Sequence, residues 1–196
     1  MEASTQPLEP EPREWQPRAT WVSARLLCGA ISFFFMAFLF GYFYLRLLNT
    51  NHAWKIGSVS PQIGLGAGVA ACVLVSAILF RLGVHRPPAD TLSTAIVAII
   101  LGLVAVVLQC IQYATLGFGP ASGGYASVFI GWTSTYAVMT LLGLIWIETQ
   151  TATLWRARRA GADENPLLKA GLEASSFYWG YFAGIGAIAF IILYLV

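Results

Sequence analysis

The feature that most constrains this chain is the distribution of its charges, which leaves four long stretches without any. No Asp, Glu, Lys or Arg occurs from 26 to 45, 63 to 80, 91 to 147 or 174 to 196. A helix crosses about 30 Å of hydrocarbon with roughly 20 apolar residues, so the stretch from 91 to 147 is long enough for two helices. The turn-forming run GFGPASGG at 117–124 interrupts it. We therefore predict an all-α membrane protein, a bundle of five transmembrane helices. The predicted spans are about 25–48, 62–84, 91–116, 125–154 and 171–196.

The composition excludes most water-soluble classes of protein. The chain is 58% hydrophobic and only 10% charged, whereas a soluble domain is about 45–50% apolar and about 25% charged. The strands of a membrane β-barrel would alternate apolar and polar residues, and these runs are apolar throughout. A net charge of +2 is too small to indicate a polyanionic partner, so we expect no nucleic acid.

The basic residues predict the orientation of the helices. Residues 1–23, rich in Pro and Glu, are predicted to form a disordered cytoplasmic tail, and 24–196 the membrane domain. The tail does not resemble a signal peptide, so we expect the first helix to stay in the mature protein. With the N-terminus in the cytoplasm, that side holds Arg13, Arg18, Arg25, Arg81, Arg86, Arg156, Arg158, Arg159 and Lys169. The other side holds only Arg46 and Lys55. This asymmetry predicts a multi-pass protein of the inner (plasma) membrane with a periplasmic or external C-terminus.

Residues for redox or metal chemistry are sparse. The two histidines, His52 and His85, fall in predicted loops, and the three cysteines fall in three different spans. Haem and copper centres in membranes usually need imidazole at depth. We therefore expect no catalytic residue, metal ligand or cofactor in this chain.

Small residues predict the packing of two helices. Gly64, Gly68, Cys72 and Ser76 recur every four residues in the second span, and Gly180 and Gly184 do so in the fifth. Such spacing lets helix backbones approach closely.

Four stretches, in order, resemble subunit III of the haem-copper oxidases (cytochrome c and quinol oxidases). The first is FMAFLFGYFYLR at 35–46. The second contains Leu101-Gly102, Gln109 and Tyr113, in the order of the family's LG…Q..EY pattern. The third contains Tyr125-Ala126-Ser127-Val128-Phe129, then Thr133 and Gly143. The fourth is Glu173-Ala174 followed by Tyr178-Trp179, as in the family's E-A…YWHFVD. The resemblance covers roughly residues 30–196 and fits the five-helix members, which lack the first two helices of longer forms.

The resemblance implies an accessory subunit of a respiratory chain that carries out aerobic electron transport. In such complexes subunit I carries the haems and one copper and reduces oxygen, and subunit II often receives electrons. Subunit III binds no redox cofactor. It packs on subunit I, holds phospholipid in a cleft, and supports proton uptake and the durability of the active site.

The chain departs from the family at most of its polar positions. The glutamates of the pattern are replaced by Phe33 and Gln112, and its two central histidines by Tyr136 and Met139. The histidine and aspartate of YWHFVD are replaced by Gly180 and Ala183. Only Glu173 remains, so the chain resembles a divergent member.

Four residues are candidates for contact with lipid or with another subunit. Arg46, at the outer end of the first span, either binds a lipid phosphate or extends to water. Tyr178 and Trp179 are expected near the cytoplasmic interface, against a lipid headgroup or in the aromatic belt. Glu173 matches the family, and it also complements the dipole of the fifth helix.

Two alternatives remain open at this point. The first is a subunit III homologue of a nitric oxide reductase, which only the catalytic subunit would distinguish. The second is a small transporter or channel, which would predict an internal repeat or a broken helix with polar groups at the midplane. Gln109, Gln112 and Thr133 are the few residues in favour of the transporter.

Overall fold

The structure is a bundle of five long helices. The computed structural model describes residues 15–49, 52–57, 59–162 and 165–196, and these contain no β-strand. The helices are α1 (Gln16–Leu47), α2 (Ile63–Val84), α3 (Pro88–Ala114), α4 (Gly124–Arg159) and α5 (Pro166–Phe190). A π-helical turn, η1 (Ile191–Leu195), continues α5. All five helices are long and apolar enough to cross a membrane, so the predicted fold class is confirmed at this level.

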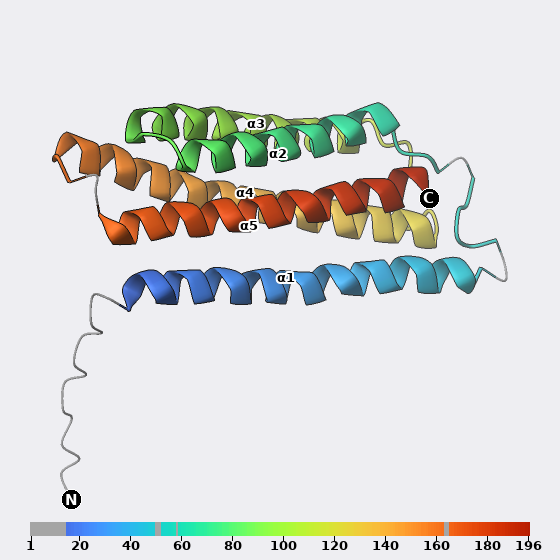
Figure 1. Ribbon diagram of the computed structural model, residues 1–196. Coiled ribbons are helices and arrows are strands. Elements are labelled where there is room, and N and C mark those ends of the chain that lie inside the picture. The colour runs from blue at the N-terminus through green and yellow to red at the C-terminus, as the bar shows by residue number, and fades with distance from the viewer. Residues whose placement is uncertain (1–14, 50–51, 58, 163–164) are drawn as a thin grey trace, which may run out of the picture.

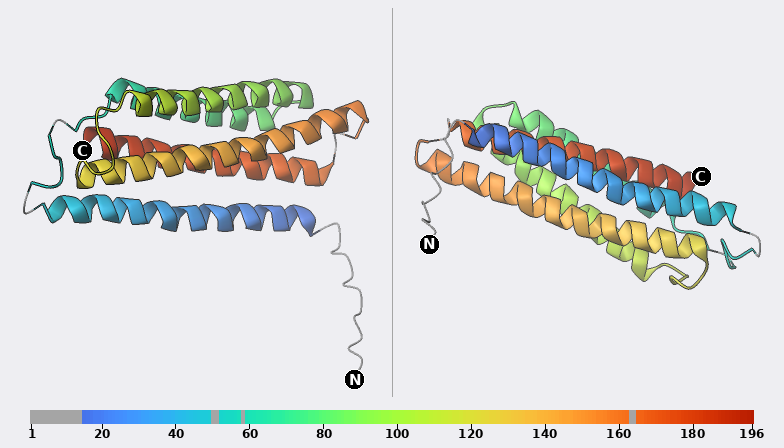
Figure 2. Two further views of the ribbon diagram at one scale, coloured as in Figure 1. Left: turned by 180° about the vertical axis from the view of Figure 1, so that it is seen from behind. Right: turned by 90° about the horizontal axis from the view of Figure 1, so that it is seen from below.

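The helices lie nearly parallel to one another and alternate in direction along the chain (Figure 1). The tightly packed pair α2 and α3 forms one side, α4 and α5 lie in the middle, and α1 covers the opposite side (Figure 1). Seen from below, α1 runs along the line between α4 and α5 and contacts both (Figure 2). The beginning of α1 and the C-terminal end of α5 therefore lie at opposite ends of the bundle. Which end faces the cytoplasm remains a prediction.

The observed helices extend beyond several predicted spans. Helix α1 begins at Gln16, so the segment 16–23 that we predicted as tail is helical, while residues 1–14 of that tail lie outside the described residues. Pro17 stands in the first turn of α1, where its missing N–H has no helical partner to lose. Helices α3 and α5 likewise start before their predicted spans, each with a proline as first residue. The predicted spans of α1, α3 and α5 were therefore too short at their N-terminal ends, where each helix begins with a turn that contains proline.

Local signals in the sequence fix the ends of the helices. The Asn165 side chain accepts a hydrogen bond from the Leu167 N–H at 2.9 Å, which caps the start of α5. Gly161 adopts a φ of 65° directly after α4, the left-handed conformation with which helices commonly end. Gly123 has a φ of 113° directly before α4, and a Cβ there would lie 2.8 Å from the Ala53 carbonyl oxygen. Glycine is thus required at this turn by conformation and by space.

Close helix packing occurs at other glycines than those predicted. Gly64, Gly180 and Gly184 have no heavy atom within 4 Å of the position that a Cβ would take. The prediction that their four-residue spacing marks a packed ridge is therefore wrong at these three positions. Close approach occurs instead at Gly143, where a Cβ would lie 2.7 Å from the Trp179 ring. A similar approach occurs at Gly186, against the Tyr136 ring.

Aromatic side chains fill the interior. The largest fully buried side chains are Trp132, Trp179, Tyr42, Tyr125, Phe80, Phe129 and Phe182. Many of the exposed side chains on α1 are apolar as well, and Phe33 is 78% exposed. Such a surface is unfavourable in water and suits a lipid environment or contact with another protein.

Candidate functional site

Arg46 lies at the C-terminal end of α1 and joins it to the last residue of the chain. Its Nη1 donates a hydrogen bond to the Val196 carbonyl oxygen at 3.0 Å and lies 3.5 Å from the Tyr42 hydroxyl. The guanidinium also lies over the Tyr42 ring, 5.9 Å from the centroid. Because a guanidinium has five N–H donors, the exposed side chain retains donors that can bind a phosphate at this end of the bundle.

Glu173 lies in a groove between the beginnings of α1 and α5. The groove has a volume of about 440 Å³ and is lined on the α1 side by Arg18, Trp21 and Arg25. Lys169, one turn before Glu173, lines it from α5. Three cations and one half-buried carboxylate therefore line this groove, which gives it a net positive character. This arrangement favours the binding of an anionic group beside Glu173.

Tyr178 is buried at the bottom of an apolar groove between α1 and α4. The groove has a volume of about 500 Å³, and its walls are mainly aliphatic and aromatic, with Phe34 on one side and Trp146 on the other. The Tyr178 and Trp146 ring centroids are 5.3 Å apart. Because Gly143 has no side chain, Tyr178 packs directly on the α4 backbone. The shape and apolarity of this groove suit a hydrocarbon chain.

Trp179 occupies the core, away from any surface. Its side chain has no exposed area, so our expectation of contact with a headgroup or the aromatic belt does not fit its position. The Trp179 Nε1–H donates to the Ser76 hydroxyl at 3.0 Å, and that hydroxyl donates to the Ala98 carbonyl oxygen at 2.7 Å. Trp179 thus links α5 to α2 and α3 through one serine.

The positions that the resemblance identifies as substituted have separate environments. Gln112 is fully buried, accepts a hydrogen bond from the Tyr194 hydroxyl at 2.8 Å and donates to the Gln62 carbonyl oxygen at 3.2 Å. Tyr136 is buried and stacks on Phe182 with centroids 4.4 Å apart. The others are Phe33, which is exposed, Met139, which lines the Tyr178 groove, Gly180, which is half-buried, and Ala183, which is buried. The substituted positions therefore form no single site.

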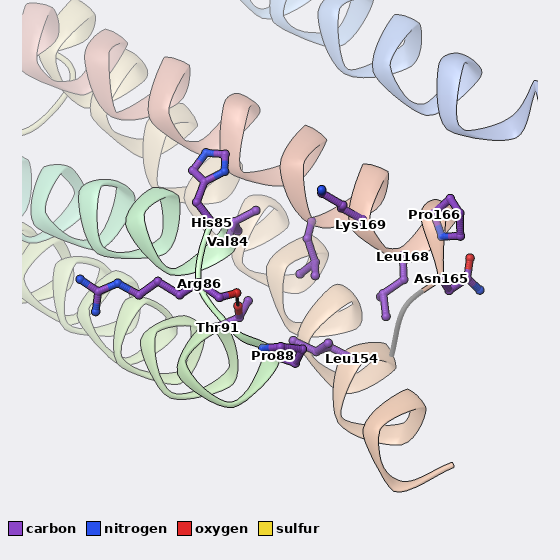
Figure 3. Close-up of a pocket in the computed structure, with 11 residues that line it drawn as sticks. Val84, His85, Arg86, Pro88, Thr91, Leu154, Asn165, Pro166, Leu168 and Lys169 are labelled. Carbon is purple, nitrogen blue, oxygen red and sulfur yellow. Dashed lines mark hydrogen bonds between the residues drawn. The ribbon is translucent and has the colours of Figure 1, made fainter. Parts of the chain in front are cut away.

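A further pocket, which the sequence analysis did not identify, lies between the α2–α3 connection and the start of α5. Its volume is about 520 Å³, and Figure 3 shows the side chains that line it. His85 and Lys169 extend on the same side of the opening, while the Arg86 guanidinium points away from it (Figure 3). The floor is apolar, formed by residues such as Leu154 and Leu168. A basic rim over an apolar floor suits an amphiphile with an anionic head.

This pocket was missed because its residues come from three separate segments. The α2–α3 turn supplies His85, the end of α4 supplies Leu154, and α5 supplies Lys169. The only signal in the sequence was the concentration of basic residues that predicted the orientation. Among the described residues, no three His, Cys, Asp or Glu side chains gather closely enough to hold a metal ion.

Comparison with known proteins shows a distant similarity to an oxidase subunit. No protein-family model matches the chain. A stretch of 88 residues is 28% identical to cytochrome c oxidase subunit 3 of Thermostichus vulcanus. This stretch is 45% of the present chain and 42% of that protein, so the chain matches less than half of its relative's length. The chain is therefore a five-helix protein of membrane-spanning character with a distant similarity to an oxidase subunit 3.

Proposed function

We propose that this chain is a non-catalytic accessory subunit III of a respiratory terminal oxidase. In this proposal it packs on subunit I of the complex, near subunit II, in the inner membrane. The haems and copper belong to those partners, and this chain binds none. Its own contributions are to stabilise the complex, to hold phospholipid and to support proton uptake. The distant similarity to an oxidase subunit 3 supports this reading.

The observation that carries the proposal is that the four stretches resembling the family contact one another. They are far apart in the sequence, yet each contributes a residue to an interhelical contact. The contacts are Tyr42 with Tyr125 (ring centroids 6.4 Å apart), the Tyr113 hydroxyl with Thr133 (2.8 Å), and Gly143 with Trp179. The resemblance thus coincides with the packing of the bundle. A role that depends on the shape of the bundle is compatible with the loss of the family's polar residues.

The experiment that tests the proposal is purification of the tagged chain in mild detergent. We expect an oxidase subunit I in the mass-spectrometric list of subunits, and haem bands in the reduced-minus-oxidised spectrum. A colourless chain that purifies alone would contradict the proposal. The catalytic subunit recovered also separates an oxygen-reducing complex from a nitric oxide reductase, because the reaction is determined there.

The lipid part of the proposal has its own supporting observations. The Tyr178 groove suits an acyl chain, and the pocket at His85 and Lys169 suits an anionic headgroup. We propose that an acidic phospholipid remains bound after purification at the pocket between His85 and Lys169, which we call the Lys169 pocket.

Native mass spectrometry of the purified complex tests this binding. Lys169→Gln is expected to reduce the retained acidic lipid several-fold, because the lysine lines both basic openings. Arg81→Gln is the matched control. Arg81 is an exposed cation in the last turn of α2, and it lines neither opening. Equal retention in both variants would contradict a lipid site at Lys169.

A further inference from the structure

The indole N–H of Trp132, on α4, has no hydrogen-bond acceptor within the described part of the protein. The side chain is 2% exposed, and its Nε1 is the one buried side-chain nitrogen or oxygen without a hydrogen-bond partner in the described part of the chain. An indole N–H is a donor only. Trp179, by contrast, donates its N–H to Ser76. Because buried donors are almost always paired, the Trp132 N–H points to a ligand that accepts a hydrogen bond.

A small cavity lies beside this tryptophan. It has a volume of about 30 Å³ and lies among α2, α3, α4 and α5. Gln109, Thr133, Tyr136 and Tyr194 line it together with Trp132. A cavity needs about 10–15 Å³ to hold one water molecule. The cavity therefore has room for one or two waters.

The polar side chains around the cavity have the bonding capacity that a water requires. The Thr133 hydroxyl donates to the Phe129 carbonyl oxygen at 2.7 Å and accepts from Tyr113 at 2.8 Å, which leaves one lone pair. Gln109 donates through Nε2 to Gln112 at 3.2 Å, and its carbonyl oxygen is an acceptor. A water that accepts from Trp132 can donate to these two groups. Buried waters typically make about three hydrogen bonds.

We propose that this cavity is an internal water site, in which an ordered water accepts the Trp132 N–H and donates to Thr133 and Gln109. The site lies about 12 Å along α4 from its first residue, by the helical rise. The water extends the hydrogen bonds that run from Gln62 through Gln112 to Gln109. It joins them to α4, so that all four helices share one polar network. This inference does not depend on the proposed function.

Ultraviolet resonance Raman spectroscopy of the purified chain tests the site, because the indole N–H bending band reports hydrogen bonding. Subtracting the spectrum of Trp132→Phe from that of the unmodified protein isolates the Trp132 band. We expect it at the hydrogen-bonded position, as for Trp179, which a Trp179→Phe difference gives as internal reference. A band at the position of a free N–H would overturn the proposal.

A second variant locates the acceptor and does not require replacement of the tryptophan. Ala70→Val adds two methyl groups at the wall of the cavity and leaves every polar group in place. We expect it to exclude the water, so that the Trp132 band moves to the free position while the Trp179 band stays. A Trp132 band that remains hydrogen-bonded would show that its acceptor lies outside this cavity and would overturn the proposal.

A third pair of variants tests the bonding of the water. Thr133→Val is expected to shift the Trp132 band towards the free position because it removes one acceptor for the water. Tyr113→Phe is the matched control. Tyr113 does not line the cavity, and its loss removes a hydrogen bond to Thr133 while the Thr133 hydroxyl remains. Equal bands in the two variants would overturn the role of Thr133 in the site.

Discussion

Gly143 is a residue at which two aromatic side chains of α5 pack against the backbone of α4. A Cβ there would lie 2.7 Å from the Trp179 ring and 3.3 Å from the Tyr178 ring. Both rings are buried, so neither can move away without disturbing its own neighbours. The glycine therefore sets the distance between the two central helices.

Gly143→Ala is expected to lower the free energy of unfolding by about 1–3 kcal/mol through overpacking, even though alanine is the better helix former. Thermal unfolding of the purified protein in detergent, followed by loss of the monodisperse chromatographic peak, measures the change. Gly180→Ala is the matched control on α5, because no atom lies within 4 Å of its Cβ position. Equal effects of the two substitutions would show that helix propensity, and not packing, decides the result.

Glu173 is the acidic residue that the resemblance to the oxidase family singles out. Under the proposed function, Glu173→Gln is expected to leave assembly unchanged and to accelerate the loss of oxidase activity during turnover. The reason is that it removes the only carboxylate of a groove whose other charged lining residues are Arg18, Arg25 and Lys169. The exposed Glu148→Gln is the control. Unchanged assembly together with an unchanged inactivation rate would exclude a functional role of Glu173.

At the scale of the elements, a short hydrogen-bonded chain holds three helices together. Trp179 of α5 donates to Ser76 of α2, and Ser76 donates to Ala98 of α3. All of it is buried, where an unpaired donor is costly. This link therefore contributes to the register of α5 against the α2–α3 pair.

Ser76→Ala is expected to destabilise the bundle by about 1–3 kcal/mol, because it leaves the buried Trp179 N–H without an acceptor. Trp179→Phe removes the donor instead, and its effect includes lost ring contacts. The double-mutant cycle isolates the hydrogen bond, and we expect a coupling of about 0.5–2 kcal/mol between the two sites. Additive effects on the unfolding free energy would contradict the link.

At the scale of the whole molecule, the predicted orientation places the two ends of the bundle on opposite sides of the membrane. Each end should therefore be accessible to a reagent from one side only. In a cysteine-free background, Gly117→Cys in the α3–α4 connection is expected to react with a membrane-impermeant maleimide in intact cells. Ala160→Cys, just after α4, is expected to react only after the membrane is opened. Both positions are exposed, so access to the protein does not confound the comparison. The reverse pattern would show that the basic residues face outward.

At the same scale, the contacts between the four resembling stretches explain how the bundle packs with few polar side chains in its interior. The contacts between the resembling stretches are mainly ring on ring and ring on glycine, as in the stacking of Tyr136 on Phe182. Such contacts depend on size and planarity. Tyr136 supplies such a planar group in the core.

The sequence by itself determined the number of helices and their approximate positions. The reason is local: a long run of apolar residues without charges is unfavourable in water, whichever segments pack against it. Only the tertiary structure decided which face of each helix is interior. Lipid is as apolar as a leucine side chain, so a residue that faces lipid and one that faces the core look alike in the sequence. Trp179 was therefore misplaced at an interface, and Gly180 could not be distinguished from Gly143. The Lys169 pocket and the Trp132 cavity became visible only when segments remote in sequence were brought together.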